Sequence, residues 1–457
     1  MNTVCEKGKC TGCMECIDIC HKGAIQIVDS GMEYNAIIDS DKCTKCNACH
    51  KACQNNRKQD LTRPIYWKQG WARDNRIRMG SSSEGLAAAI ERSFVKNGGM
   101  VCSCVFRSGR FEFDFAETED DVSKFAGSKY IKSSPEGIYS KIAERLKVGN
   151  KILFVGLPCQ VAAVKHYTKN HQNLYTIDLI CHGTPSPMIL ERFLDDYGIE
   201  LEKIENIRFR VKNNFALEQN YKCFSVPTTT DNYLMTFLNS TTYTENCYEC
   251  RFAQLERAGD ITLGDSWGSE LDQDAQNKGI SLLLCQNEKG MELIEKTELI
   301  LMDVDFERAI ENNHQLQHPS LKPQQREIFF REFNKGREFK SIVKKCYPKK
   351  YMKNTVKTML YKLRHLGGAE SLSNNSNSAC KWKSKENVLT IENGIIQSGY
   401  KRYHTPQVRL DLGYRPQYTI GSCCCFKNLL LCLIGKGLTW VISYNRYTAQ
   451  GYLLHSP

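Results

Sequence analysis

The sequence has no apolar run behind its N-terminus and no uninterrupted apolar stretch long enough to cross a membrane. The opening residues, MNTVCEKGKC, therefore predict no secretory signal and a reducing, cytoplasmic location in which disulfides are rare. The most apolar stretch, LLLCLIGKGLTWVI, lies close to Lys427 and contains Lys436. A lysine at mid-bilayer costs about 3 kcal/mol, which argues against a span there.

A net positive charge is also absent from most of the chain. The 457 residues carry a net charge of +11, but residues 1–330 hold 40 basic and 45 acidic side chains. Residues 331–366 hold 12 basic and 2 acidic side chains, and the remainder holds 10 and 4. The excess is thus confined to the C-terminal quarter, and no recognition motif accompanies it, so we expect no nucleic-acid partner. A hydrophobic content of 41% excludes wholesale disorder.

Cysteine, in contrast, is abundant: there are 23, nine of them by residue 53. Clustered cysteines in a reducing compartment favour metal or redox chemistry over disulfides. Two copies of one four-cysteine run occur, with spacings of two, two and three intervening residues. They are Cys10, Cys13, Cys16 and Cys20, then Cys43, Cys46, Cys49 and Cys53.

This double run resembles the bacterial two-cluster ferredoxins, in which the fourth cysteine of each run binds the other run's cluster. The pattern assigns Cys10, Cys13, Cys16 and Cys53 to one 4Fe-4S cluster, and Cys43, Cys46, Cys49 and Cys20 to a second. His21 and Gln54 replace the proline that usually follows the fourth cysteine, a residue that supplies no ligand. The alternative is two zinc sites, although zinc ribbons use paired CxxC motifs. Cys5 lies outside the pattern and is interpreted as a bystander.

Helices and strands alternate from residue 61 to about 330. Ser82 or Ser83 is expected to cap a helix through LAAAIERSFVKN. Ser134-Pro135 predicts the start of a second helix that ends near Gly149.

Strand patterns in the same region are equally regular. MVCSCVF and RFEFDF alternate in period two around Ser108-Gly109, which predicts a hairpin. KILFVG and LYTIDLI are apolar runs separated by a predicted helix over residues 159–169, hence two parallel strands. We expect an α/β (mixed α+β) fold: a ferredoxin-like N-terminal domain joined to an α/β core, with a basic C-terminal extension.

Several motifs in this region carry a second resemblance. In order, they are GSSSEG at 80–85, AGSKYIKS at 126–133, GLPCQ at 156–160, DLICHGTPSP at 178–187, and CYECRF with DITLGDSWG between 247 and 268. Together they resemble the beta subunit family of coenzyme F420 hydrogenase and dehydrogenase. The resemblance implies bound FAD and electron exchange with a deazaflavin or another small molecule. The domain boundaries expected from these patterns are 1–60, 61–150, 151–330, 331–366 and 367–457.

A third metal site is predicted in the same region. Cys159 and Cys181 each follow an apolar strand of the βαβ unit, so both lie at the edge of the sheet where ligands bind. Cys247 and Cys250 form a CxxC pair. We expect these four thiols to bind a third 4Fe-4S cluster; the alternative is that the first two are buried core residues.

Flavin and catalytic residues follow mainly from the resemblance. The SSSEG turn, with Ser81, Ser82, Ser83 and Gly85, offers hydroxyl and amide groups to a pyrophosphate at a helix N-terminus. Glu84 stands where the family tends to have glycine, which leaves the flavin's pose open. The resemblance implies that Lys129 contacts flavin or substrate and that Asp265 belongs to the same pocket; the alternative for Lys129 is a surface position. His182 is a candidate proton shuttle, since histidine titrates near neutrality, or a structural residue.

The sequence thus predicts an iron–sulfur flavoprotein oxidoreductase that passes electrons between its clusters and FAD. One alternative substrate is a sugar or cell-envelope precursor; one alternative role is a noncatalytic electron-transfer subunit. An electron-donor or electron-acceptor protein is the expected partner. Residues 331–366, with aromatics among lysines, are expected to form a solvated basic helix or a membrane-surface helix. Residues 381–457 match no motif.

Overall fold

The computed structural model describes residues 2–81, 84–210 and 215–365, together with four short strands beyond them. The chain divides into two compact units, Met1–Tyr361 and Lys362–Pro457. In the second unit, β15 (Leu389–Glu392) pairs antiparallel with β16 (Ile395–Ser398), and β17 (Ile442–Tyr444) with β18 (Gly451–Leu453). The polar run at 371–379 and the apolar stretch around 429–442 lie largely outside the described residues, as do Ser82 and Ser83.

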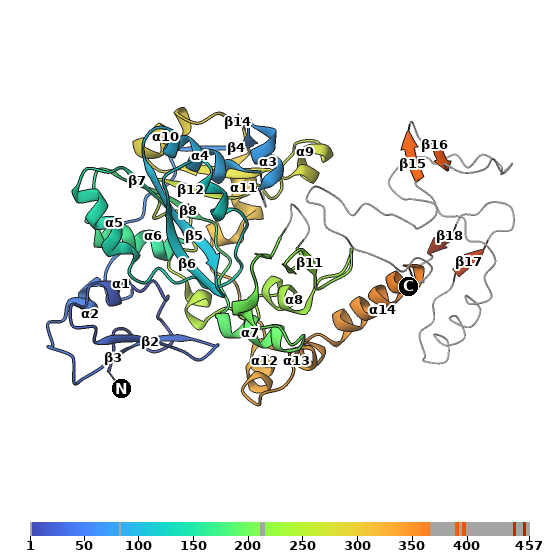
Figure 1. The fold of residues 1–457 in the computed structure, drawn as a ribbon, viewed down its shortest axis with the longest axis horizontal. Coiled ribbons are helices and arrows are strands. Elements are labelled where there is room, and N and C mark those ends of the chain that lie inside the picture. Colours follow the sequence, from blue (N-terminus) through green and yellow to red (C-terminus); the bar gives the residue numbers. More distant parts are fainter. Residues whose placement is uncertain are drawn as a thin grey trace. The chain divides into compact units, whose positions relative to one another are not determined.

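The N-terminal residues form a small ferredoxin-like part (Figure 1). Its antiparallel sheet has the order β1-β3-β2, built from β1 (Asn2–Thr3), β2 (Ile25–Asp29) and β3 (Tyr34–Ile38). Two short helices, α1 (Glu15–Asp18) and α2 (Ala48–Ala52), lie against each other, and each begins inside one of the cysteine runs. Cysteines make up much of its small core, so this part depends on what they bind.

An eight-stranded mixed sheet forms the centre of the larger part. Its order is β14-β4-β13-β12-β8-β7-β5-β6. The strands are β4 (Tyr66–Ala72), β5 (Met100–Arg107), β6 (Arg110–Ala116), β7 (Ile152–Gly156), β8 (Leu174–Leu179), β12 (Ile261–Asp265), β13 (Ser281–Cys285) and β14 (Leu299–Met302). The strands β5, β7, β8 and β12 are parallel, and the others add antiparallel. The predicted hairpin is β5–β6, and the predicted parallel pair is β7–β8.

Helices cover both faces of this sheet. Leu153 and Val155 of β7 pack with α4 (Leu86–Lys96) and α10 (Glu288–Glu295) on one face. Ile152 and Phe154 point the other way, toward α5 (Ile138–Lys147) and α6 (Pro158–Tyr167). This alternation explains why the run KILFVG is apolar throughout: both faces of the strand are buried. The expected mixed α/β fold class is confirmed.

One helix begins later than its sequence predicts. The expected start at Ser134-Pro135 is wrong, since α5 begins at Ile138 after Gly137, whose φ is +73°. The amide of Ser134 instead donates to the carbonyl of Phe111, 2.7 Å away, and extends the pairing along β6. Similarly, Gly85 rather than Ser82 or Ser83 is the N-cap of α4.

A second, helical core lies below the sheet in Figure 1. It contains α7 (Pro187–Asp195), α8 (Asn232–Leu238), α12 (Gln325–Phe333) and α13 (Phe339–Cys346). Phe339, Ile342 and Val343 are fully buried here, so the first half of the basic segment belongs to the core. The following α14 (Pro348–His365) has no buried residue. Among the described residues, no helix combines the length and apolarity needed to cross a membrane.

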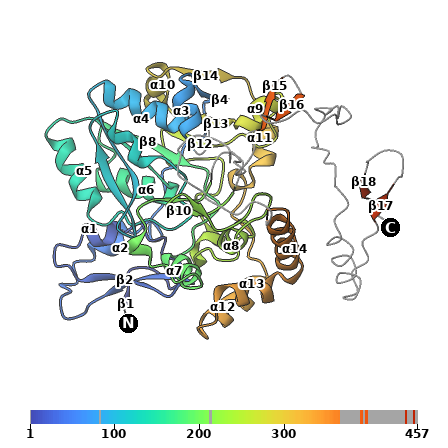
Figure 2. The same ribbon diagram turned by 45° about the vertical axis from the view of Figure 1, so that its right-hand side comes forward.

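Shorter elements complete the first unit. They are α3 (Asn75–Gly80), α9 (Gln273–Lys278), α11 (Phe306–Asn312), the 3-10 turns η1 (Asp121–Phe125), η2 (Leu201–Lys203), η3 (Glu245–Glu249) and η4 (His314–Leu316), and a small sheet of β9 (Ile207–Arg208), β10 (Glu218–Gln219) and β11 (Lys222–Cys223). Both ribbon views place α1 and α2 beside α5 and α6 (Figures 1 and 2). The ferredoxin-like part therefore rests on one helical layer of the central sheet, and α1 contacts both helices of that layer.

Candidate iron–sulfur and flavin site

The thiols assigned to a first cluster lie together in the ferredoxin-like part. Cys53, although it belongs to the second run, is an electrostatic neighbour of Cys10, Cys13 and Cys16. All four are buried. The structure thus brings the fourth cysteine of one run to the first three of the other, as the ferredoxin pattern requires.

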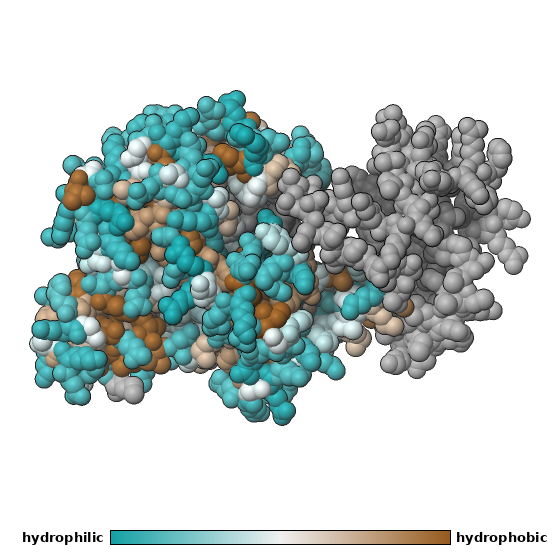
Figure 3. All heavy atoms as spheres, viewed as in Figure 1, coloured by the Kyte–Doolittle hydropathy of each residue, from teal (hydrophilic) through white to brown (hydrophobic). Residues whose placement is uncertain are grey.

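The second set lies nearer to solvent. Cys49 is an electrostatic neighbour of Cys20 and Cys43. These three thiols are half-buried and Cys46 is exposed. Figure 3 shows hydrophobic residues gathered on the ferredoxin-like part, at the lower left of the molecule. A partner protein would therefore reach this set more easily than the first.

The two cysteine runs repeat one backbone conformation. Gly12 and Lys45 precede the second cysteine of their runs and have φ of +71° and +57°. Met14 and Asn47 follow that cysteine with φ of +59° and +63°. The three non-glycine residues hold this left-handed conformation at a cost of about 1–2 kcal/mol each. Such repeated strain around thiols is typical of a backbone shaped to wrap a bound group.

Backbone amides also point at the thiols. The amide of Lys45 donates to Sγ of Cys43 over 3.4 Å, and the amide of Gly12 donates to Cys10 at the equivalent position. Hydrogen bonds of this kind favour the thiolate, which is the form that binds metal. Cys5, interpreted from the sequence as a bystander, lies next to the first thiol set, because its thiol hydrogen-bonds with Cys10 and Cys53.

The third set lines a single cavity of about 190 Å³. Cys159 is in the first turn of α6, directly after β7, and Cys181 is two residues beyond β8. These strands are paired in parallel, so their carboxyl ends meet at one edge of the sheet. Cys247, in η3, and Cys250, just after it, face that edge and complete the lining. Four thiols around one cavity have the donor chemistry of a 4Fe-4S site.

Electrostatic contacts within this third set agree with the shared cavity. Cys181 is a neighbour of Cys247 and Cys250, and Cys159 of Cys181 and Cys250. Among the described residues, no three or more His, Cys, Asp or Glu side chains are arranged to hold a single metal ion. A cubane cluster takes each thiolate on a different iron, so it does not require one common point.

The cavity borders the first cysteine loop. The side-chain amide of Gln54 donates to the hydroxyl of Thr11 over 2.7 Å and to the carbonyl of Cys159 over 3.2 Å. The ammonium of Lys132 donates to the carbonyl of Thr11 over 3.0 Å. Cys13 and Cys159 are electrostatic neighbours across this contact. The polar contacts of Thr11, Gln54 and Lys132 therefore lie between the first and third thiol sets.

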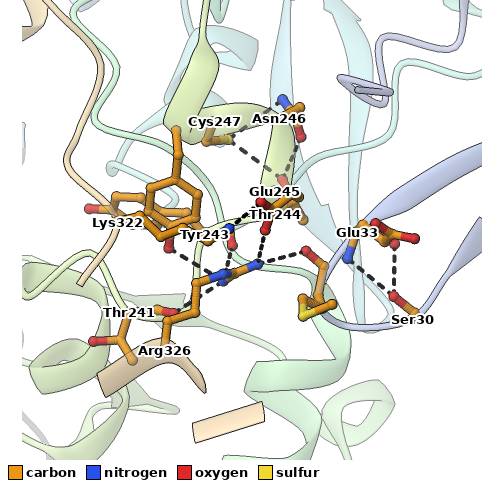
Figure 4. A network of polar contacts seen from close by, with 12 residues as sticks. Ser30, Glu33, Thr241, Tyr243, Thr244, Glu245, Asn246, Cys247, Lys322 and Arg326 are labelled. Carbon is orange, nitrogen blue, oxygen red and sulfur yellow. Dashed lines mark hydrogen bonds and ion pairs between the residues drawn. The ribbon is translucent and has the colours of Figure 1, made fainter. Parts of the chain in front are cut away.

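Arg326 holds the segment that carries Cys247 against the ferredoxin-like part (Figure 4). Its guanidinium is buried, and Nη1 donates to the carbonyl of Tyr243 over 2.6 Å. Nη2 donates to the carbonyl of Met32 over 3.0 Å and to Glu245 over 3.1 Å. Met32 belongs to the β2–β3 turn. The Arg326 side chain therefore joins this turn to the segment that carries Cys247.

Two polar side chains touch the thiol of Cys247 itself. The hydroxyl of Thr244 lies 3.5 Å from Sγ, and the amide of Asn246 donates to Sγ over 3.7 Å (Figure 4). Hydrogen bonds to ligand sulfurs tune the potential of a cluster.

The turn expected to bind flavin phosphate lies at the start of α4. Gly85 caps that helix with φ of +83° and contributes no side chain to its first amides. The hydroxyl of Ser81 donates to the carbonyl of Ile77 over 2.8 Å. The Ser81 hydroxyl is thus engaged within the protein, and Ser82 and Ser83 lie outside the described residues.

Glu84 is buried and turned toward β13. Its carboxylate accepts a hydrogen bond from Ser281 over 2.5 Å and interacts with the guanidinium of Arg78. A Cβ at Gly279 would lie 1.9 Å from Oε1, so glycine there makes room for the carboxylate. The carboxylate of Glu84 is therefore accommodated inside the protein, between Ser281, Arg78 and Gly279.

Two further candidates, Asp265 and Lys129, lie outside the cysteine cavity. Asp265, at the end of β12, pairs with Arg210 over 2.5 Å and lies opposite Ser281 in the strand register. Lys129 donates to the carbonyls of Phe125 and Ala126, over 2.7 and 3.3 Å, and burial lowers its pKa. The side-chain hydrogen bonds of Lys129 thus end on its own loop.

His182 lines the cysteine cavity. The Gln315 amide nitrogen lies 2.6 Å from its Nδ1, and the Ser320 hydroxyl donates to its carbonyl over 2.7 Å. Loss of hydration, together with the neighbouring His314, lowers the pKa of His182 to about 4. The ring is therefore neutral at pH 7, which differs from the near-neutral titration on which its expected shuttle role rests.

Comparison with known proteins agrees with the two resemblances. Residues 9–56 match the family described as the 4Fe-4S dicluster domain. Residues 149–301 match the family described as the C terminus of the coenzyme F420 hydrogenase/dehydrogenase beta subunit. The chain thus carries an iron–sulfur dicluster domain followed by a domain of that second family. Through these two segments the chain is related to iron–sulfur electron-transfer oxidoreductases.

One similar solved structure belongs to the xenon-derivatised F420-reducing [NiFe] hydrogenase complex from Methanosarcina barkeri. The identity is 19%, the TM-score is 0.42, and the match covers 57% of this chain and 93% of that one. A search of curated proteins gave no significant match.

Sequence reasoning missed several residues of this site. Lys132 stands in the motif AGSKYIKS, three residues after Lys129, but no spacing rule singles it out. Gln54 had a signal, because it departs from the usual proline. Arg326 had none, since its partners lie far away in the sequence.

Proposed function

We propose that this protein is an iron–sulfur flavoprotein oxidoreductase with three 4Fe-4S clusters and FAD. The first cluster would be held by Cys10, Cys13, Cys16 and Cys53, the second by Cys20, Cys43, Cys46 and Cys49, and the third by Cys159, Cys181, Cys247 and Cys250. The observation that carries the proposal is the third cavity: four cysteines from three segments line it, directly beside the first cysteine loop.

The exposure of the second thiol set supports an entry point for electrons. Cys46 of that set is exposed, all four thiols of the first set are buried, and the third set lines a cavity at the edge of the sheet with three half-buried thiols and one buried thiol. Electrons would enter or leave at the second set, where a donor or acceptor protein can approach. Protein packed around the first set limits the access of water and oxygen to it.

FAD would bind along the carboxyl edge, with its pyrophosphate at the N-terminus of α4. Asp265 pairs with Arg210 and Glu84 interacts with Arg78, so both negative charges are balanced within the protein. When bound, FAD pairs single electrons from the clusters for a two-electron exchange with a deazaflavin or another small molecule. His182, which lines the cavity, would hold a hydrogen bond there.

Iron analysis of the purified full chain tests the third site. Three clusters correspond to about twelve irons per chain, and the double variant C159A/C250A should retain about eight. C223A, which removes an exposed cysteine outside the three sets, is the control and should keep the full content. About eight irons in the unmodified chain would refute the third cluster.

An anaerobic flavin spectrum tests the catalytic assignment. Bleaching of the visible flavin band by a reduced deazaflavin supports the proposed reaction. A chain that binds its clusters without flavin would instead be an electron-transfer subunit for a partner enzyme. Bleaching only by a different reductant would replace the deazaflavin by another small molecule.

A further inference from the structure

Lys132 is a buried lysine whose side chain enters the first cysteine loop. It is 6% exposed, and its ammonium donates to the carbonyl of Thr11, between Cys10 and Cys13. Its amide donates to the carbonyl of Pro185 over 2.9 Å, which anchors the backbone. A buried ammonium requires compensating partners, and here an anionic cluster on each side would supply them.

The loop is shaped to admit this side chain. A Cβ at Gly12 would lie 3.1 Å from Cδ of Lys132 and 2.9 Å from the ring of Tyr34. The ammonium lies 5.2 Å from the centre of that same ring. The absence of a side chain at position 12 thus leaves room for Lys132 and also permits the left-handed turn.

The same ammonium faces both thiol sets. Lys132 lines the cavity with Cys159 and Cys181. Its charge acts on Cys10 of the first set and on Cys159 and Cys181 of the third. Lys129, in the same motif, acts instead on Cys104 and Glu91.

We propose that Lys132 is a positioning residue shared by the first and third clusters, whose fixed positive charge raises the reduction potentials of both. The inference rests on the proposed third cluster. Reduction adds one electron to each cluster and makes it more negative, so a nearby ammonium stabilises the reduced form. Lys132 gains and loses no proton in this step. Because it acts on both clusters, its charge shifts the two potentials in the same direction.

The test is an anaerobic redox titration of the full chain, followed by electron paramagnetic resonance. The signals of the two clusters are assigned with C159A/C250A, which retains the first cluster. In K132M, the ratio of reduced to oxidised form at a fixed potential should fall at least tenfold for both clusters. A tenfold fall corresponds to about 59 mV for a one-electron couple. K132R should stay near the unmodified chain.

Two further variants separate charge from structure. K132Q keeps a donor for the carbonyl of Thr11 without the charge and should lower both potentials as K132M does. K96M removes an exposed lysine from the last turn of α4 and should change neither. If K132M loses iron and its potentials cannot be compared, the redox titration is carried out with K132Q instead.

Iron-replete K132Q with unchanged potentials, or with only one potential shifted, would overturn the proposal. About eight irons per unmodified chain would refute the third cluster itself, and this inference with it. About twelve irons with unchanged potentials would refute the role of Lys132 alone.

Discussion

Arg257 and Asp178 form a fully buried ion pair, with Nη2 of the arginine 2.9 Å from Oδ1 of the aspartate. Asp178 lies in β8, three residues before Cys181, and Arg257 lies seven residues after Cys250. The other carboxylate oxygen accepts the amide of Gly259 over 2.8 Å. The pair therefore connects the segment that carries Cys181 with the segment that follows Cys250.

Removing one partner of this pair should be strongly destabilising. R257M would leave a buried carboxylate without its cation, and we expect a loss of about 3–5 kcal/mol in unfolding free energy. Denaturant titration measures it, and iron analysis should show loss of the third cluster. K278M, which breaks the exposed pair with Asp274, is the control and should cost less than about 1 kcal/mol. An R257M chain as stable as this control would contradict the prediction.

The contact between Asp18 and α5 gives a second prediction. Asp18 accepts the amides of Gly137 and Tyr139 over 2.7 and 3.0 Å, and so caps α5 from the ferredoxin-like part. D18A should cost about 1–2 kcal/mol, as the loss of an N-cap does. Hydrogen exchange at the first turn of α5 should become faster. D41A, at an exposed position in the same part, should leave that exchange unchanged; equal exchange in both variants would rule out the cap.

Glu91 predicts a pH dependence. Burial in α4 raises the pKa of this carboxyl from its ordinary 4.5 to about 8, against the opposing charge of Lys129. A raised folded pKa favours the protonated form, so its stabilising effect is complete below about pH 4.5 and is lost as pH rises to about 8.

The matching variant is E91Q, which stays neutral at every pH. The thermal midpoint of the unmodified chain, relative to E91Q, should fall steadily between about pH 5 and pH 8 and then level off. E91D retains the titration and serves as the control. A constant difference over this range would show that Glu91 is not buried as a carboxyl.

Truncation should separate the two parts of the basic segment. A chain ending at residue 366 keeps α12, α13 and α14 and should retain full iron content and its melting temperature. A chain ending at residue 338 loses Phe339, Ile342 and Val343, each worth about 1.5–3 kcal/mol of burial. That sum is comparable with the whole stability of a typical domain, so this chain should be insoluble or unfolded. Equal behaviour of both truncations would contradict the packing of α13.

Local patterns predict the elements that depend on local sequence. The apolar runs at β7 and β8, separated by one helix, predict two parallel strands and hence the shared edge of Cys159 and Cys181. The spacing of the first eight cysteines predicts the exchange of Cys20 and Cys53 between the two sets. In both cases the information lies within a few dozen residues.

Long-range contacts decide what sequence reasoning misses. The start of α5 depends on Asp18, more than a hundred residues earlier, and no rule of helix capping extends over that distance. The choice between Lys129 and Lys132 depends on where the ferredoxin-like part rests. Only after that contact is known does Lys132, rather than Lys129, face the thiols.

Because of the contacts through Thr11, Asp18 and Gln54, the first 60 residues cannot be replaced by another ferredoxin domain without loss of contacts to the rest of the chain. A graft of another two-cluster ferredoxin at this place would bring its clusters and usually a proline at position 54. It would then leave α5 without its cap and the carbonyl of Cys159 without its donor. A successful exchange would have to carry these side chains along, so substitutions in the two parts of this chain are constrained to change together.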